Sequence, residues 1–581
     1  MILNDSVVNF LPQRVCFFLT LLIMIRDYRL SSIIFATLTI PMNIEFNKNE
    51  DAMKMLLSHM QKRLEKIYEG GGKKAIQKQR EKNKLTARER INYLVDAGRS
   101  FIEIGAFAGY EMYEAQGGCP AGGAVGGLGY VSGRQCVVVA NDQTVKAGAW
   151  FPITGKKNLR LQEIAMENNL PIIYLVDSAG VFLPMQDEIF PDKEHFGRIF
   201  RNNARMSAMG ITQIAAVMGA CVAGGAYLPI MSDETLMVEG ASIFLAGPYL
   251  VKAAIGEDID TETLGGAVTH TEISGIADYK FKTEHECMDH IKKMMSMLGE
   301  KEKAGFDRTE SRMPKKNPED LYGIFPFDGK PYDMLEIIER IVDDSEFEQF
   351  KEDYGKTIIC GYGRIDGWAV GIVANQRKIV KSKKGEMQMG GVIYNDSADK
   401  AARFILNCNQ KKIPLVFLQD VTGFMVGSRS EQAGIIKDGA KMVNAVANSV
   451  VPKITIIVGN SYGAGNYAMC GKAYDPRFIY AWPTAKIAVM GGDQAAKTLL
   501  QIQVSAMKAK GEEIAPENEQ KLLSEIKNRY DQQTTPYYAA ARLWVDAIID
   551  PIDTRKVISE GIAAANHDAD IEDMKLGVFQ V

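Results

Sequence analysis

The sequence predicts an α/β fold made of two tandem halves of the same design. Blocks of sequence recur in the same order about 240 residues apart, and each block holds an unbroken apolar run near a glycine-containing turn. Apolar runs of five to eight residues are typical of strands buried on both faces of a parallel sheet. Because helical stretches follow these runs, we expect βα units with right-handed crossovers.

The repeated blocks define the two halves. Each block has a counterpart in the second half: 129–141 with 363–375, 170–180 with 413–423, 211–227 with 451–467, and 243–247 with 487–491. The offsets range from 234 to 244 residues, a variation that loops can absorb. We therefore place an N-terminal domain at 50–312 and a C-terminal domain at 316–575, with a linker rich in Lys, Pro and Asp at 301–330.

Other helices are expected around this frame. Residues 51–68 form a charged amphipathic pattern, and Thr86-Ala-Arg-Glu89 has the spacing of a capping box that opens a helix. Residues 494–528 form a long polar helical stretch.

The first 41 residues differ from the rest. The apolar run 15–25 would span roughly 16 Å as a helix, about half of a bilayer's hydrocarbon core. No basic start or small-residue cleavage site accompanies it, as a secretory signal would require. We expect translation to begin at Met42 and residues 1–41 to be a non-native or disordered extension.

Composition excludes several functional classes. The 581 residues carry a net charge of −4, which gives no reason to expect nucleic acid as a partner. The eight cysteines are scattered without a C-x-x-C pair, which argues against a zinc ribbon or a disulfide framework and favours a cytoplasmic location. With six histidines that lack metal-ligand spacing, we expect no metal site.

Two motifs suggest chemistry that their context does not support. Ala52-Met-Lys54-Met55 matches the tetrapeptide that carries biotin, but Lys54 lies in a helical pattern instead of at a hairpin tip. Gly459-Asn-Ser461-Tyr-Gly463 matches G-x-S-x-G, for which His567 is the only downstream histidine. The first half has Cys221 at the position of Ser461, so the halves share the turn and not the nucleophile. A serine hydrolase that uses Ser461 remains an alternative.

A pair of small-residue turns carries the main functional prediction. The turns are 223–226 (AGGA) and 463–466 (GAGN), at matching positions in the two halves. Such turns let a ligand oxygen approach backbone N–H groups, and one such donor typically stabilises an oxyanion by about 3–4 kcal/mol. Close helix–strand packing would also explain one such turn. Two equivalent turns predict a reaction in which two different oxyanions are stabilised.

At these turns the chain resembles the carboxyltransferase subunits of biotin-dependent acyl-CoA carboxylases, most of all those of the methylcrotonyl-CoA type. The resemblance runs from about residue 64 to the C-terminus. Its motifs include LVDSAGVFLP (175–184), FPDKEHFGRIF (190–200), MGACVAGGAY (218–227), IFLAGPYLVKAAIGE (243–257), DVTGFMVG (420–427), SYGAGNYAMCGKAYDPRF (461–478) and LWVDAIIDPIDTR (543–555).

The resemblance implies two tandem crotonase-like (ClpP/crotonase) domains and an enzyme without a metal. It implies a homodimer that builds a larger oligomer, of hexameric size, with an active site between the N-half of one subunit and the C-half of its mate. Biotin, as carboxybiotin, would come from a separate biotin carrier subunit, charged by a biotin carboxylase. The other substrate would be an acyl-CoA, and no membrane partner is implied.

The family's site residues map onto both turns. The amides of Gly224 and Gly225 would hold the enolate oxygen of the acyl-CoA, and those of Ala464 and Gly465 the ureido oxygen of biotin. Further substrate-binding residues would be Ala223, Gly180, Gly463, Thr422, Gly423, Lys157 and Arg160, the last two as phosphate partners. The acyl-CoA-binding stretch maps onto 333–361.

One departure from the family pattern is an insertion at 376–390, in the half that would hold biotin. A same-fold alternative is the carboxyltransferase subunit of a sodium-pumping acyl-CoA decarboxylase, which runs the chemistry backwards.

Overall fold

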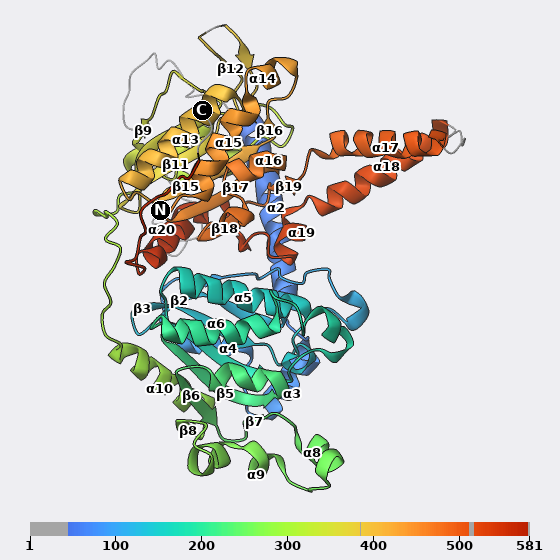
Figure 1. Cartoon of the computed structure of the whole chain (residues 1–581), viewed down its shortest axis with the longest axis vertical. Helices are drawn as coiled ribbons and strands as arrows, with labels where there is room; N and C mark the ends of the chain where they lie inside the picture. Colours follow the sequence, from blue (N-terminus) through green and yellow to red (C-terminus); the bar gives the residue numbers. More distant parts are fainter. Residues whose placement is uncertain (1–43, 384, 510–515, 579–581) are drawn as a thin grey trace, which may run out of the picture. The chain divides into compact units, whose positions relative to one another are not determined.

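The computed structural model describes residues 44–383, 385–509 and 516–578, so the expected extension 1–41 and Cys16 lie outside the described residues. Residues 48–581 form one unit that holds two mixed β-sheets (Figure 1). The first sheet has the strand order β1 (Ile102–Glu103), β2 (Ala124–Val131), β3 (Arg134–Asn141), β4 (Ile172–Ser178), β5 (Gln213–Val222), β6 (Glu234–Val238) and β8 (Tyr279–Phe281), with β7 (Ser242–Phe244) paired to β5.

The second sheet repeats this topology. Its strand order is β9 (Phe347–Gln349), β10 (Ile358–Ile365), β11 (Trp368–Asn375), β15 (Leu415–Val421), β17 (Lys453–Tyr462), β18 (Phe478–Ala481) and β20 (Ala547–Ile548), with β19 (Lys486–Ala488) paired to β17. In each sheet an antiparallel hairpin leads into strands that run parallel. The predicted duplication is therefore present in the order and the direction of the strands.

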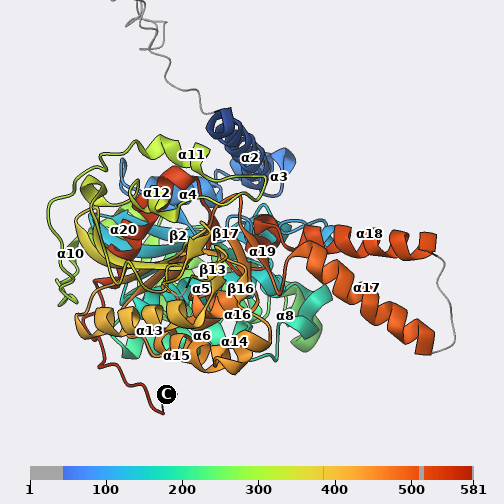
Figure 2. The same cartoon turned by 90° about the horizontal axis from the view of Figure 1, so that it is seen from above.

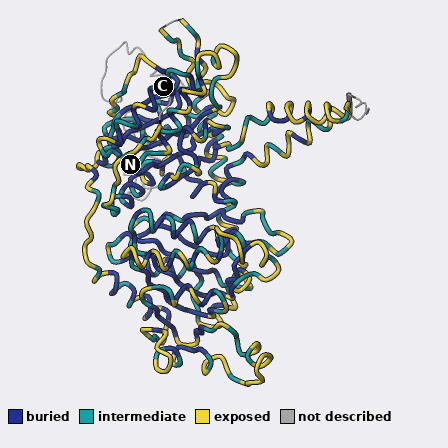
Figure 3. The backbone as a smooth tube through the Cα atoms, in the orientation of Figure 1, coloured by how far each residue is buried: buried dark blue, intermediate teal, exposed yellow. Residues whose placement is uncertain are grey.

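The apolar runs form the buried centre of each sheet. Every residue of β4 and of β15 is buried. The interior of each half is mostly dark blue, the colour of buried residues, in Figure 3. Helices α4 (Ala87–Leu94) and α10 (Glu284–Met297) cover one face of the first sheet, and α5 (Pro152–Glu167) covers the other. In the second half α13 (Asn395–Gln410) and α15 (Ile435–Ala447) pack on Phe417 of β15. Truncating such a buried phenylalanine to alanine typically costs about 3–5 kcal/mol.

Most of the expected helices are present. The pattern at 51–68 belongs to α2 (Ile44–Tyr68), where Lys54 pairs with Glu50 one turn away. Lys54 is thus on the surface of a helix, as expected. The capping box is confirmed at the start of α4, because Thr86 Oγ1 accepts a hydrogen bond from the Glu89 amide and the Glu89 carboxylate accepts one from the Thr86 amide.

The stretch 494–528 is not one helix. It divides into α17 (Gly492–Ala509) and α18 (Pro516–Gln533), which pack side by side through Leu500 and Ile526 and project away from the second sheet in both views (Figures 1 and 2). Pro516 at the first position of α18 favours a helix start and ends any helix that precedes it. In the described parts of the chain, no helix is long and apolar enough to cross a membrane.

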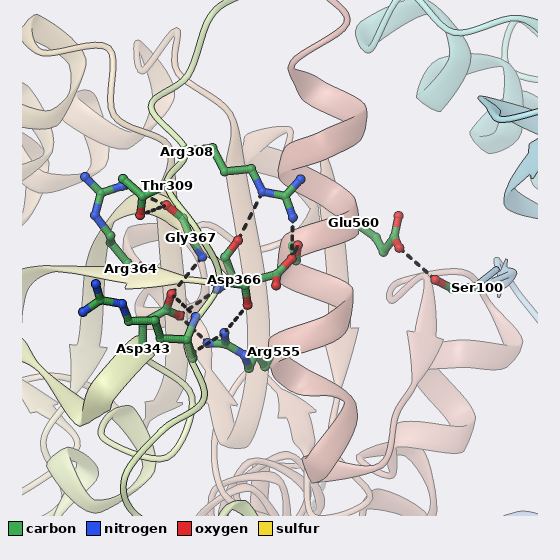
Figure 4. Close-up of polar contacts among 12 residues, drawn as sticks. Ser100, Arg308, Thr309, Asp343, Arg364, Asp366, Gly367, Arg555 and Glu560 are labelled. Carbon is green, nitrogen blue, oxygen red and sulfur yellow. Dashed lines mark hydrogen bonds and ion pairs between the residues drawn. The ribbon is translucent and has the colours of Figure 1, made fainter. Parts of the chain in front are cut away.

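Helix α20 (Thr554–Ala565) ties the halves together (Figure 4). Its Glu560 accepts hydrogen bonds from Ser100 Oγ and Tyr130 OH of the first half, both at 2.8 Å. One turn earlier, Arg555 is ion-paired with Asp343 of the second half. The predicted linker is irregular up to residue 317 and then forms η9 (Pro318–Asp320) and α11 (Leu321–Ile324).

Candidate active site

The two predicted turns have the same backbone form. In the first half β5 ends at Val222 and the turn η7 (Ala223–Ala226) follows, and in the second half α16 (Gly463–Ala468) follows β17. Ala223 has φ +55° and its counterpart Gly463 has φ +53°. A left-handed alanine costs roughly 1 kcal/mol, so the first half retains a strained conformation that glycine adopts freely in the second. We call these turns, 223–226 and 463–466, the first and second cradles.

Backbone amides are the chemical groups that each cradle offers. The first amides of a helical turn have no partner within that turn. Within the described part of the chain, the amides of Gly224, Gly225, Ala464 and Gly465 donate to no group outside their own turn. Each cradle therefore presents a pair of donors of the kind that forms an oxyanion hole.

Two further predicted residues lie beside the cradles. A Cβ atom built on Gly225 would lie 3.9 Å from Gly180 Cα, and one built on Gly465 would lie 3.3 Å from Gly423 Cα. Gly180 and Gly423 are counterparts in the repeat. The structure thus brings together the predicted glycines of each half, in two equivalent groups.

Buried side chains hold the first cradle. Ser178 Oγ accepts hydrogen bonds from Trp150 Nε1 at 2.9 Å and from the Gly180 amide at 3.1 Å. Cys221 Sγ lies 3.3 Å from the Gly225 carbonyl oxygen, to which it donates. Burial raises the pKa of Cys221 to about 12, so its thiol stays protonated and acts as a donor, not as a nucleophile.

The serine hydrolase hypothesis is wrong. Ser461 lies inside strand β17, fully buried, and not at an exposed elbow. Its Oγ donates to Gln419 Oε1 at 2.6 Å and accepts from Asn466 Nδ2 at 2.7 Å. His567 makes no hydrogen bond to it and instead lines a different cavity, with Trp368.

A pair of buried carboxylates lies behind the cradles, and sequence reasoning gave them no role. Asp177 and Asp420 are counterparts in the repeat, and both are buried. A Cβ atom on Gly219 would lie 2.0 Å from the Asp177 carboxylate, and one on Gly459 would lie 2.5 Å from that of Asp420. These glycines are therefore required by the carboxylates. The recurrence of an Asp and a Gly at matching places in the two repeats was the available signal.

The two carboxylates form ion pairs with arginines from different parts of the fold. Arg90 of α4 contacts Asp177 at 3.2 Å, and Arg377, at the start of the insertion, contacts Asp420 at 3.2 Å. Tyr332 OH also donates to Asp420, at 3.0 Å. Burial raises the pKa of Asp420, and the Arg377 guanidinium opposes that shift.

A cavity of about 410 Å³ opens beside the second cradle. Its lining includes the apolar residues Ile457, Ile487 and Trp544 and, among polar groups, Asn466 of the cradle, Ser461 and Lys472. Its size and its lining, mostly apolar with a few polar groups, are typical of a site for a small organic ligand.

The structure corrects the expectation for Lys157 and Arg160. Lys157 is fully buried, and its Nζ donates to the carbonyls of Gly105, Ala121 and Ala124 at 2.7–3.0 Å. Burial lowers the pKa of Lys157 to about 8. Arg160 is buried against Asp546 of the second half at 2.8 Å. Both cations hold the protein together and are not positioned for a phosphate.

The insertion is anchored beside the second cradle. Gly391 O accepts hydrogen bonds from the Thr422 amide at 2.8 Å and from Thr422 Oγ1 at 3.1 Å. Thr422 thus fixes the end of the insertion, whose strands β12 (Val380–Lys381) and β13 (Met387–Gln388) pair as a hairpin. The expected acyl-CoA stretch 333–361 lies at the β9–β10 edge of the second sheet, with β11 and β15 between it and β17. In the part of the chain that is described, no group of side chains could hold a metal ion.

Comparisons with known proteins agree with this geometry. The carboxyl transferase domain family matches residues 78–576. The methylcrotonoyl-CoA carboxylase beta chain of Arabidopsis thaliana is 48% identical over 544 residues, which cover 92% of this chain and 90% of that protein. The biotin-dependent 3-methylcrotonyl-coenzyme A carboxylase beta1 subunit of Mycobacterium tuberculosis is 46% identical over 91% of this chain and 98% of its own length.

A solved structure shares the fold. The beta subunit of geranyl-CoA carboxylase from P. aeruginosa superposes with a TM-score of 0.80 at 39% identity, over 92% of this chain and 97% of that one. The predicted fold class, two tandem crotonase-like domains, is confirmed. The chain belongs to the carboxyl transferase family and is a carboxyltransferase subunit of the acyl-CoA carboxylase type.

Proposed function

We propose that this chain is the β subunit of a carboxylase that acts on a branched, methylcrotonyl-CoA-like acyl-CoA and takes the carboxyl group from carboxybiotin on a separate chain. The observation that carries the proposal is the pair of cradles, one in each half, whose first residues share a positive φ of +55° and +53°. Two donor pairs suit a reaction between two substrates that each develop negative charge on an oxygen. The names of the relatives support carboxylase β chains and give no support to the sodium-pumping decarboxylase subunit.

The first cradle would bind the thioester oxygen of the acyl-CoA. When a proton leaves the acyl group, negative charge grows on that oxygen, and the Gly224 and Gly225 amides stabilise it more strongly than the neutral carbonyl. Cys221 and Ser178 fix the backbone on either side, so the donors need no rearrangement during the reaction. The acyl-CoA is thereby held as the nucleophile.

The second cradle would bind the ureido oxygen of biotin through the Ala464 and Gly465 amides. The adjoining cavity, with Ile457, Ile487 and Trp544 on its wall, fits a compact ring system with one polar edge. Carboxybiotin supplies the carboxyl group and, once that group has left, the nitrogen that receives the substrate proton. This chain's own contribution is to orient the ureido group and to stabilise charge on its oxygen.

A dimer would bring the two cradles into one site. Beside the first cradle, Tyr227 is 47% exposed and Leu245 is 61% exposed; their counterparts beside the second, Tyr467 and Val489, are 48% and 73% exposed. Large apolar groups exposed at equivalent places on both halves favour burial in an interface. We propose that the first cradle of one subunit faces the second cradle of its mate, and that such dimers assemble further, to a hexamer.

The test is a carboxylation assay of the purified chain with a biotin carboxylase and a biotin carrier subunit. Methylcrotonyl-, geranyl-, propionyl- and acetyl-CoA are compared at equal concentration. We expect kcat/KM to be highest for methylcrotonyl-CoA. A preference for acetyl- or propionyl-CoA would overturn the proposed substrate, and no carboxylation of any of the four would overturn the proposed function.

A further inference from the structure

Three polar side chains joined by hydrogen bonds, which we call the polar row, lie behind the second cradle and have no equivalent behind the first. Gln419 of β15, Ser461 of β17 and Asn466 of α16 are joined by hydrogen bonds of 2.6 and 2.7 Å. Their counterparts in the first half are Val176, Cys221 and Ala226. The duplicated halves therefore differ in polarity directly behind the two cradles.

The polar row of Gln419, Ser461 and Asn466 is anchored by hydrogen bonds at both ends. Gln419 Nε2 donates to the Met469 carbonyl at 2.6 Å, just past the end of α16. Asn466 is the residue after Gly465, and its carbonyl accepts from the Gly471 amide at 2.8 Å. A Cβ atom on Gly471 would lie 1.9 Å from Asn466 Oδ1, so the Asn466 side chain fills the space that a glycine leaves open.

Burial makes this arrangement costly to break. Gln419 and Ser461 are completely buried, and every side-chain donor or acceptor that loses its partner there costs about 1–3 kcal/mol. Linked hydrogen bonds in a low-dielectric interior also strengthen one another. The Asn466 side chain is thus held in one position, and with it the peptide that carries the Gly465 amide.

We infer that Gln419, Ser461 and Asn466 are positioning residues that set the direction of the second cradle's amides toward the ureido oxygen. This inference rests on the proposed function of that cradle. An oxyanion donor must lie within a few tenths of an ångström of its best position, and a 1 Å misplacement can cost about a hundredfold in rate. The G-x-S-x-G motif then has a supporting role: Ser461 accepts a hydrogen bond from the side-chain amide of Asn466 and donates one to Gln419.

The experiment compares Ser461→Ala and Asn466→Ala with Thr455→Val, a matched control. Thr455 is also buried on β17, and its hydroxyl donates to the Cys470 carbonyl at 2.7 Å. Its loss removes a similar hydrogen bond to the same segment 469–471 but leaves Gln419, Ser461 and Asn466 joined. The readouts on the full chain are affinity for free biotin by saturation-transfer NMR, affinity for acyl-CoA by calorimetry, and carboxyl transfer to free biotin.

We expect both alanine variants to lower biotin affinity severalfold and transfer at least tenfold, with acyl-CoA affinity unchanged within twofold. The double variant should lose no more biotin affinity or transfer rate than the poorer single variant, because both substitutions break the same row of hydrogen bonds. Thr455→Val should keep both affinities. If Ser461→Ala does not fold, Ser461→Cys, with the residue of the first half, replaces it.

Ala464→Pro separates two kinds of failure, because it deletes one cradle amide at a position in the first helical turn where proline is tolerated. If it abolishes biotin binding while Ser461→Ala and Asn466→Ala bind and transfer normally, the positioning role is overturned and the cradle assignment stands. If Ala464→Pro also leaves biotin binding and transfer intact, the proposed function of the second cradle fails, and the inference with it.

Discussion

The substitution Gly225→Ala separates catalysis from folding better than any other change in the two cradles. A Cβ atom at Gly225 would meet no protein atom closer than 3.9 Å. At Gly465 it would lie 2.6 Å from Val421 Cγ2, and at Gly224 it would lie 2.7 Å from Phe196 Cε1. A contact below 3.0 Å forces a shift of the neighbour, so the two halves differ in tolerance even though their backbones match.

The expected size of the effect follows from these distances. Because the added methyl group contacts nothing at less than van der Waals distance, Gly225→Ala should change the free energy of unfolding by no more than about 1 kcal/mol. The methyl group enters the space next to Gly180, where the thioester oxygen would lie. The Gly225 amide N–H remains in this variant, so the loss comes from pushing the oxygen away from its donors. A misplacement of 1 Å can cost about a hundredfold in rate.

The assay is carboxyl transfer between a carboxylated acyl-CoA and free biotin, with thermal unfolding of the same preparation. We expect an unchanged melting temperature within a few degrees and a loss of kcat of at least a hundredfold. A folded Gly225→Ala variant that retains transfer within threefold of the unaltered chain would show that the first cradle does not hold the reacting oxygen. Gly465→Ala should instead lower both stability and activity, because Val421 must move.

Three other predictions concern the interior. Arg160→Met should destabilise the chain by about 3 kcal/mol in urea unfolding, because Asp546 loses a buried partner; an intact fold with only a raised KM for acyl-CoA would instead favour phosphate binding. Burial raises the pKa of Glu167 to about 7, whereas the unfolded chain should titrate near 4.5, so the unfolded state loses its proton first and stability falls as pH rises from 4.5 to 7. Glu167→Gln should therefore stabilise by about 1–3 kcal/mol at pH 8 and hardly at pH 4, and an equal gain at both values would contradict this. Glu560→Ala should lower the melting temperature without changing acyl-CoA affinity, because Ser100 and Tyr130 lose their shared acceptor; an unchanged melting temperature would show that α20 does not tie the halves.

The sequence predicts the sheets because their strands are apolar over their whole length and occur twice. The cradles were predictable for a related reason, since small residues recur at matching places. Lys157 and Arg160 could not be placed in this way. Helix α5 is buried along most of its length, and its cations are neutralised or solvated inside the protein: Arg160 faces Asp546 of the second half, and Lys157 faces carbonyls of the first. The mixed polar and apolar sequence of α5 does not show that these cations are internal.

The supporting groups behind the cradles depend on contacts between strands. Asp177 and Asp420 were visible as repeated residues, but their fit against Gly219 and Gly459 needs the register of neighbouring strands. Ser461 was visible within a hydrolase-like motif, and only its place inside β17 shows that it is buried. The two turns were therefore predictable from the sequence, whereas the buried side chains that hold them were not.

The most direct measurement is a crystal structure of the full chain with acyl-CoA and biotin both bound. We expect the thioester oxygen to lie about 2.7–3.1 Å from the Gly224 and Gly225 amides of one subunit. We expect the ureido oxygen at the same distance from the Ala464 and Gly465 amides of the mate. Either oxygen bound elsewhere, or both cradles covered by protein and closed to ligand, would show that the cradles are not the oxyanion sites.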